Sequence, residues 1–470
     1  MSWASDIFPD QEVRHGDRQL LILFLAALAV RVAYALVLYS TIGLPGITAE
    51  DSAGFLHLSS SFATAVADGT VSGWEWLGPT SSIMPLFLWI LAGLHLLAGD
   101  DASWLFVMLN CAADAGTALV VVALAGRICS DFARAAGWFY ALAPTPIIIA
   151  GIVFTDSLFV FLGVLSLWQF LRWVEDRNMA SAASFGAALG FAAMVRSVMA
   201  PWAVAAFLAA GIIALLSRGK RVGSLGQLVA AGLIALVIVS PVLTRNLAKY
   251  DSLAFTSQTG RHLLFWVVPF VEQTATGAAW EANVARLRNI DEVREVEAQD
   301  NQFNVSAGLT AYAFKELRRL GLPNIAKTWG VGIAINLTVP AVSVAPPARS
   351  LPRPRYYGTV GQGVLGKIRN YVGAVIETLY GQLLILGFAG LLLFRLLQLV
   401  GLGTCYKAAK GTTLFLAAWC LYFLLISGPI ASPKYRLPLE PVLAVFAGAG
   451  WKVIRQRQSQ SKDRKASNVA

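Results

Sequence analysis

The sequence is short of charged residues, cysteine and histidine. Charged side chains make up 14% of the 470 residues, whereas a soluble domain carries roughly 25%. The composition therefore excludes an ordinary soluble protein. The four cysteines and four histidines are scattered along the chain. That scatter excludes a disulfide framework and any zinc motif whose ligands lie close together in the sequence.

Apolar residues are abundant instead, and they collect in long blocks. They make up 57% of the chain, in runs of about 17 to 25, the length that crosses ~30 Å of hydrocarbon as a helix. Only a helix satisfies its own backbone hydrogen bonds inside lipid. The sequence therefore predicts an all-α polytopic membrane protein. Its first block, Leu20–Leu38, is too long for the core of a cleaved signal peptide and is predicted to be a retained span.

The charged loops predict which blocks cross the membrane. Lys and Arg gather on cytoplasmic loops. The basic loops all fall on the cytoplasmic side only if block 83–98 does not cross the membrane. We therefore expect that block to lie at the outer interface, and Trp329–Ala345, which contains Asn336 and Pro340, to be interfacial or re-entrant. About ten spans remain, with both termini cytoplasmic: 20–40, 104–126, 135–154, 157–173, 180–198, 200–217, 223–243, 378–400, 411–428 and 438–454.

This topology divides the chain into four regions. The first external loop (41–103) lacks Lys and Arg but carries six acidic residues, and it belongs to an N-terminal transmembrane module. A long external segment follows, with a polar helix predicted over Glu281–Asn301. The net charge of +10 fits basic cytoplasmic loops and tails rather than nucleic-acid binding. The four regions are 1–243, 244–377, the C-terminal transmembrane helices 378–454 and the basic cytoplasmic tail 455–470.

Ionisable residues converge on the outer face, where their cost in a membrane marks them as functional candidates. A carboxylate there can take a proton from an attacking hydroxyl, and cations stabilise the charge that grows on a departing phosphate. This pattern suits group transfer from a lipid phosphate. The candidate carboxylates are Asp51, Asp156 and Glu50, and the candidate donor-binding residues are Lys434, Arg436, Tyr435, Arg261 and Arg196.

Each candidate also has a structural interpretation. Asp51 and Asp156 both stand where a helix is expected to begin, and short acidic side chains cap helices. Lys434 and Arg436 can instead anchor the chain at lipid headgroups. Glu50 adjoins Asp51, so it can share or replace the role of Asp51.

The order of several motifs resembles a known family. Glu50-Asp51 with Phe55, the Pro-rich stretch with Pro79 and Pro85, Thr155–Phe159 and Lys434–Pro441 together resemble the GT-C superfamily of membrane glycosyltransferases. The likeness is greatest to the PMT/ArnT-like branch, which is similar to glycosyltransferase family 39, and it spans most of residues 20–450. Phe55 stands where that family usually has tyrosine, so any role of that hydroxyl is absent.

The resemblance implies an activity and roles for the residues. It implies transfer of a hexosyl or pentosyl group from a polyprenyl-phosphate donor to a glycan, lipid or protein acceptor on the extracytoplasmic side. Asp51 would be the general base of an inverting reaction, with Asp156 a second acid or an ion ligand. Lys434 and Arg436 would lie near the carrier phosphate.

Several alternatives stay open from the sequence. Mg²⁺ or Mn²⁺ can bridge Asp51 and Asp156, because hard cations prefer oxygen ligands, but no motif requires a metal. A transporter or flippase for lipid-linked saccharides, or an O-antigen-type polymerase, also fits a polytopic chain with a long external segment. We expect the bacterial inner membrane as the location, with a periplasmic active site.

Overall fold

The computed structural model describes residues 13–216, 221–349, 351–352, 354, 356 and 358–467. These residues form helices joined by turns, with no strand among them, which confirms the all-α prediction. Eight helical segments are long and apolar enough to span a membrane. They contain α1 (Val13–Ile42), α4 (Ala102–Gly126), α7 (Asp156–Asp176), α9 (Met199–Leu216), α10 (Arg221–Tyr250), α19 (Leu379–Ala408), α20 (Lys410–Ser427) and α22 (Glu440–Ser467).

Two other predicted spans correspond to shorter helices. Block 180–198 becomes α8 (Met179–Val195), which is apolar but only 17 residues long. Block 135–154 becomes two helices, α5 (Ala133–Ala141) and α6 (Pro144–Ala150). Pro144 explains the break, because proline has no N–H to donate and constrains the residue before it away from the helical conformation.

A buried charged pair holds the broken helix in place. Arg31 of α1 is fully buried and donates from Nε to Asp114 Oδ2 of α4 at 2.5 Å. Its Nη1 donates to the Ala141 carbonyl at 2.8 Å, a carbonyl left without a helical partner where α5 ends. The Tyr140 hydroxyl donates to Asp114 Oδ1 at 2.6 Å. Every member of this network is paired, as burial in a low-dielectric interior requires.

Short helices connect the first two long ones. The helix α2 (Glu50–Ala67) follows α1, and α3 (Pro85–Ala98) precedes α4. A left-handed glycine, Gly99 (φ 55°), begins the turn between α3 and α4. Block 83–98 is therefore a separate helix from α4.

The segment from 251 to 378 is also helical. The polar helix predicted over Glu281–Asn301 is two helices, divided at Asn289-Ile290, and Asn301 caps the helix that follows. The segment contains α11 (Thr259–His262), a π-turn (Leu263–Val267), α12 (Val268–Thr276), α13 (Trp280–Arg288), α14 (Asp291–Glu297), α15 (Gln302–Leu320), α16 (Leu322–Thr338), α17 (Pro346–Arg349) and α18 (Gly363–Val375).

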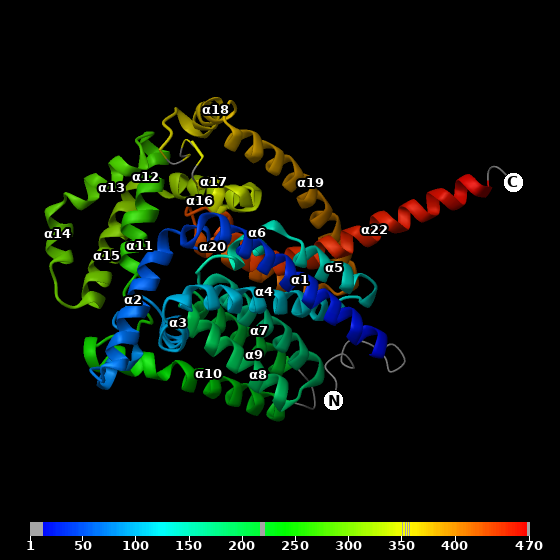
Figure 1. Ribbon diagram of the computed structural model, residues 1–470, viewed down its shortest axis with the longest axis horizontal. Helices are drawn as coiled ribbons and strands as arrows, with labels where there is room; N and C mark the ends of the chain where they lie inside the picture. The colour runs from blue at the N-terminus through cyan, green and yellow to red at the C-terminus, as the bar shows by residue number, and fades with distance from the viewer. Residues whose placement is uncertain are drawn as a thin grey trace.

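The helices α11 to α15 form a bundle with its own apolar core, which includes Leu264, Val268, Leu287 and Leu309. In Figure 1 this bundle lies with α2 at one end of the molecule, while α22 extends from the opposite end. The last short helix, α21 (Pro433–Arg436), precedes α22. The residues that the sequence singles out lie where α2, α7, α8, α11 and α21 begin or end.

Candidate functional site

The loop before α7 is pinned to the start of α2. Ser52 is buried, and its hydroxyl donates to the Val153 carbonyl at 2.9 Å while it accepts from the Ala49 amide at 2.8 Å. Asn110 of α4 donates to the carbonyls of Ile152 and Phe154 at 3.1 and 3.0 Å. These bonds fix the start of α2, which carries Asp51, against the loop that leads into Asp156.

Asp51 and Lys434 form the exposed half of the site. Lys434 Nζ lies 2.6 Å from Asp51 Oδ2 and 4.1 Å from the centroid of the Phe154 ring. The Asp51 side chain is 56% exposed and that of Lys434 only 16%. The carboxylate is therefore open to a ligand, and the ammonium is held against it by protein on its other sides.

Neighbouring charges set the pKa of Asp51. Burial raises it, but Lys434, and then Arg196 and His262, outweigh that effect and hold the pKa of Asp51 below its ordinary value. The start of α2 acts in the same sense, because a helix N-terminus favours a negative charge. Asp51 is therefore a carboxylate at neutral pH.

Asp156 and Arg196 form the buried half. Asp156 begins α7, is 2% exposed, and its Oδ1 is paired with Nη1 of Arg196, the residue that ends α8. The other oxygen, Oδ2, is buried without a hydrogen-bond partner among the described residues. Asp156 and Asp51 both act electrostatically on Lys434. Two carboxylates and two cations thus share one site.

His262 comes to the same site from α11. Burial, and then the positive charge of Arg196, lower the pKa of His262, and Asp51 opposes that shift. The imidazole is therefore neutral at neutral pH. Gly260 holds α11 in place: its amide donates to Ser306 Oγ at 3.0 Å, and a Cβ there would lie 2.2 Å from the Ser306 carbonyl oxygen.

Other predicted residues lie outside this cluster. Arg436 is 1% exposed and donates four hydrogen bonds within the protein, to Glu440 Oε1, to the carbonyls of Asn336 and Val339, and to Thr145 Oγ1. With its donors engaged in this way, it holds helices together and is poorly placed to bind a phosphate.

Three further candidates have other surroundings. Arg261 is about half exposed and pairs with Glu297 of the external bundle at 3.0 Å. Tyr435 is partly buried beside Lys434. Glu50 is the first residue of α2, and its side chain lies outside the described part of the structure.

The sequence interpretation missed His262 and Asn110. Within Gly260-Arg261-His262 it selected the arginine, because charge was the only signal available, whereas in the structure the histidine is the one influenced by the charges of Arg196 and Asp51. Asn110 is a polar residue within an apolar block, and that cost is a signal that would have found it.

The described side chains of the site pair with cations from the chain rather than gather into a metal-binding group. Among the described residues no group of three or more His, Cys, Asp or Glu side chains is placed to hold a metal ion. Lys434 contacts Asp51 and Arg196 contacts Asp156, so each carboxylate already has a positive partner from the chain. We therefore derive no step through Mg²⁺ or Mn²⁺.

Comparisons with known proteins agree with this architecture. Residues 79–244 match the family model described as dolichyl-phosphate-mannose-protein mannosyltransferase. A comparison with curated protein sequences finds no match.

The fold matches the archaeal oligosaccharyltransferase AglB from Archaeoglobus fulgidus, in a complex with an inhibitory peptide and a dolichol-phosphate. The TM-score is 0.53 and the identity 12%, over 96% of this chain and 51% of that one. The same enzyme with Zn and sulfate gives a TM-score of 0.52 and 14% identity, over 94% and 49%.

ArnT from Cupriavidus metallidurans, bound to undecaprenyl phosphate, gives a TM-score of 0.36 and 15% identity, over 92% and 79%. The chain spans about half the length of the archaeal chains that it matches. It is a multi-span membrane protein with the GT-C glycosyltransferase fold, and its residues 79–244 carry the sequence pattern of the dolichyl-phosphate-mannose-protein mannosyltransferase family.

Proposed function

We propose that this protein transfers a hexosyl or pentosyl group from a polyprenyl-phosphate donor to an acceptor on the extracytoplasmic side of a bacterial inner membrane. The observation that carries the proposal is the half-exposed Asp51 carboxylate held 2.6 Å from Lys434, with Asp156 and Arg196 beside them. A base and two cations at one site are what such a transfer needs.

The reaction is a single displacement. Asp51 takes the proton from the acceptor's nucleophilic group, which attacks the anomeric carbon of the sugar from the face opposite the phosphate. The bond between that carbon and the phosphate oxygen breaks, and polyprenyl phosphate leaves with the electron pair. One displacement at carbon inverts its configuration, so the product has the opposite anomeric form.

Lys434 has two partners in this scheme. It pairs with Asp51 Oδ2 at 2.6 Å, and a donor phosphate competes for the same ammonium. When Lys434 turns to the phosphate, the carboxylate loses its strongest stabilising contact and becomes a better base. Binding of the donor therefore activates Asp51.

Asp156 acts through Arg196. It is 2% exposed, too buried to meet an acceptor, and it orients the guanidinium whose planar fork suits phosphate oxygens. The AglB structure holds a dolichol-phosphate, and a carrier of that chemical class in this chain is part of the proposal.

The test is a transfer assay on the full chain in liposomes, with polyprenyl-phosphate sugars as donors and extracted envelope glycans, lipids and proteins as acceptors. Asp51→Asn is expected to lower turnover by about 10²–10⁴-fold, the usual contribution of general-base catalysis. The control is Asp68→Asn, which changes an exposed acid at the other end of α2.

Normal turnover by Asp51→Asn would refute the assignment of the base. Movement of lipid-linked sugar across the liposome membrane without a covalent product would refute the transferase and favour a flippase. Products of many joined repeat units would favour a polymerase.

A further inference from the structure

A large cavity lies on the external segment, away from Asp51. Its volume is about 1100 Å³, and its walls come from the end of α12, from α16, from Tyr356 and from residues between Thr359 and Asn370, with Pro429 at one edge. Three cations line it: Lys327 of α16, and Lys367 and Arg369 of α18. None of the described lining residues is acidic.

The rest of the lining is polar enough to hold an anion. Gln273, Thr274, Gln362 and Asn370 provide amides and hydroxyls. Lys367 Nζ donates to Gln273 Oε1 at 2.7 Å and lies 4.5 Å from the centroid of the Tyr356 ring. Glu281 is the acid that acts on Lys367, and it does not line the cavity.

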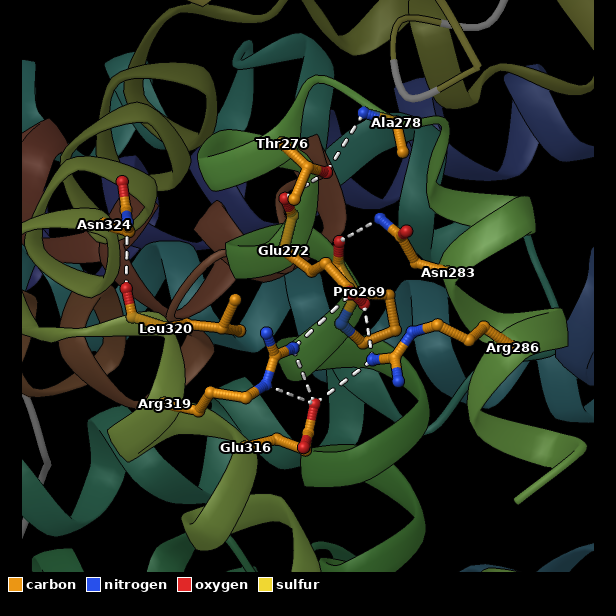
Figure 2. Close-up of polar contacts among 10 residues, drawn as sticks. All are labelled: Pro269, Glu272, Thr276, Ala278, Asn283, Arg286, Glu316, Arg319, Leu320 and Asn324. Atoms are coloured by element: carbon orange, nitrogen blue, oxygen red, sulfur yellow. Dashed lines mark hydrogen bonds and ion pairs between the residues drawn. The ribbon is translucent and has the colours of Figure 1, made fainter.

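An ionic network fixes the wall formed by α12. Figure 2 shows Arg286 and Arg319 around Glu272 and Glu316, with Arg286 Nη2 2.9 Å from Glu272 and 3.1 Å from Glu316. Arg319 Nη2 lies 2.8 Å from Glu316. Both carboxylates are largely buried, at 8% exposure. The next residues of α12, Gln273 and Thr274, line the cavity, so this network sets their position.

The cavity is connected to Lys434. Gly332 of α16 lines it and packs so closely on the chain before α21 that a Cβ would lie 2.3 Å from the Gly428 carbonyl oxygen. One turn later, Asn336 Oδ1 accepts from the Ser432 amide at 2.9 Å. Ser432 caps the helix that carries Lys434. The α16 helix thus forms a wall of the cavity and also positions Lys434.

The helix that carries two of the cations also has an apolar face. Ile368 and Val372 are exposed, and their spacing of four residues places them on one side of α18, whereas the exposed Leu365 lines the cavity. A short turn joins α18 to the lipid-spanning α19. This side is therefore suited to the membrane surface, and the cavity opens at the level of lipid headgroups.

We propose that this cavity binds a phosphate group carried by the membrane-borne acceptor, and so presents the acceptor's nucleophile to Asp51. The identification of the phosphate carrier as the acceptor rests on the proposed function. The binding of phosphate rests only on Lys327, Lys367 and Arg369 and is measured without turnover.

The first experiment measures thermal stabilisation of the full chain in phosphatidylcholine nanodiscs. One arm adds inorganic phosphate at constant ionic strength, and another replaces part of the lipid with phosphatidic acid. Wild type and Arg318→Gln, an exposed cation outside the cavity, are expected to be stabilised. Lys327→Gln/Arg369→Gln is expected to need at least about tenfold more phosphate, since 1.4 kcal/mol is tenfold in affinity.

The two arms distinguish the sources of phosphate. Stabilisation by both probes means that the phosphate group suffices, and stabilisation by phosphatidic acid alone means that the lipid chain is also needed. An equal response of the double variant and wild type would overturn the proposal, as would no response of wild type to either probe.

The second experiment uses the transfer assay. Lys327→Gln/Arg369→Gln is expected to raise the acceptor KM roughly tenfold while the donor KM stays unchanged, the result of losing acceptor contacts. A raised donor KM would overturn the assignment to the acceptor. If Asp51→Asn binds phosphate but wild type shows no transfer, the proposed transferase activity is refuted. The proposal of an anion site is then still supported.

Discussion

Lys434 Nζ lies 2.6 Å from Asp51 Oδ2, across 383 positions of the sequence. The pair joins the start of α2 to the short helix α21, and the centroid of the Phe154 ring lies 4.1 Å from the ammonium. Because Asp51 is the more exposed partner, a ligand that enters the site meets the carboxylate first. The pair therefore makes the pKa of the proposed base depend on Lys434.

Replacement of Lys434 by glutamine is expected to change the pH profile as well as the rate. Burial still raises the pKa of Asp51, and the largest opposing charge is gone, so that pKa rises. The acid limb of kcat/KM, which follows ionisation of the free enzyme's base, moves to higher pH. Turnover also falls, by about 10²–10³-fold, the usual cost of losing one stabilising donor.

The matched control is Lys249→Gln, an exposed lysine at the end of α10. It is expected to leave both the rate and the acid limb unchanged. A Lys434→Gln enzyme with a wild-type acid limb would show that Asp51 does not titrate in the reaction.

Arg196 is expected to act by its charge and by its fork geometry. Arg196→Gln leaves Asp156 buried without its ion-pair partner and removes a cation from the site, so we expect a loss of about 10²-fold in kcat. Arg196→Lys keeps the charge but not the two-pronged geometry, and is expected to recover part of the activity. Equal activities of the lysine and glutamine variants, measured by single-turnover transfer, would contradict the role of charge.

Apolar block length predicted the all-α fold well, because lipid imposes helix length and backbone pairing directly. It did not predict the break between α5 and α6, where α6 begins at Pro144 and Arg31 Nη1 donates to the Ala141 carbonyl at the end of α5. Glu281–Asn301 also differed from the prediction, because polarity alone does not show that a helix ends at Asn289.

The candidate site was predictable in part. A charged residue near an apolar block is costly in a membrane, and a single sequence is enough to recognise it. This signal selected Asp51, Asp156, Arg196 and Lys434. The roles of His262 and Arg436 did not follow from it, because they depend on which way a side chain turns. The pattern of Lys434-Tyr435-Arg436 gives both cations equal weight, yet the structure directs one to Asp51 and the other to Glu440.

Glu316→Gln is expected to weaken the external bundle. Glu316 is largely buried between Arg286 and Arg319, and loss of its charge costs about 1–2 kcal/mol, discounted because both arginines are half exposed. Hydrogen exchange in α12 and α15 should then rise. The control is Glu295→Gln, which changes an acid of α14 outside the network.

Acid should produce the same loss in the wild type. Burial raises the pKa of Glu316, but Arg319 and Arg286 outweigh it and hold that pKa below its ordinary value. A carboxyl whose folded pKa is lowered contributes stability above its unfolded pKa and loses it as the pH falls through the folded one. Exchange in α12 and α15 should therefore rise below about pH 4.5 in wild type and change less in Glu316→Gln. Equal acid sensitivity of the two proteins would contradict the assignment to Glu316.

The anion affinity of the external cavity is expected to fall as the pH rises from 7 to 9. Burial lowers the pKa of Lys367 to about 8, against the opposing charge of Glu281, and only the protonated ammonium attracts an anion. Lys367 Nζ contacts Gln273 and the Tyr356 ring, and the described lining of the cavity contains no carboxylate that could titrate in this range. Sulfate is the suitable probe, because its charge is constant over these pH values, and the affinity should drop roughly tenfold, or 1.4 kcal/mol.

The stability of the protein alone should change in the opposite direction. A lysine whose folded pKa is lowered binds fewer protons in the fold than in the unfolded chain between about pH 8 and pH 10.5, so its contribution to stability rises with pH there. In nanodiscs the increment in Tm due to sulfate should therefore shrink while the contribution of Lys367 to the Tm without sulfate grows. Lys367→Arg, which stays charged throughout, should bind sulfate equally at pH 7 and 9. An increment that falls equally in Lys367→Arg and wild type would show that another group titrates and that Lys367 does not hold the anion.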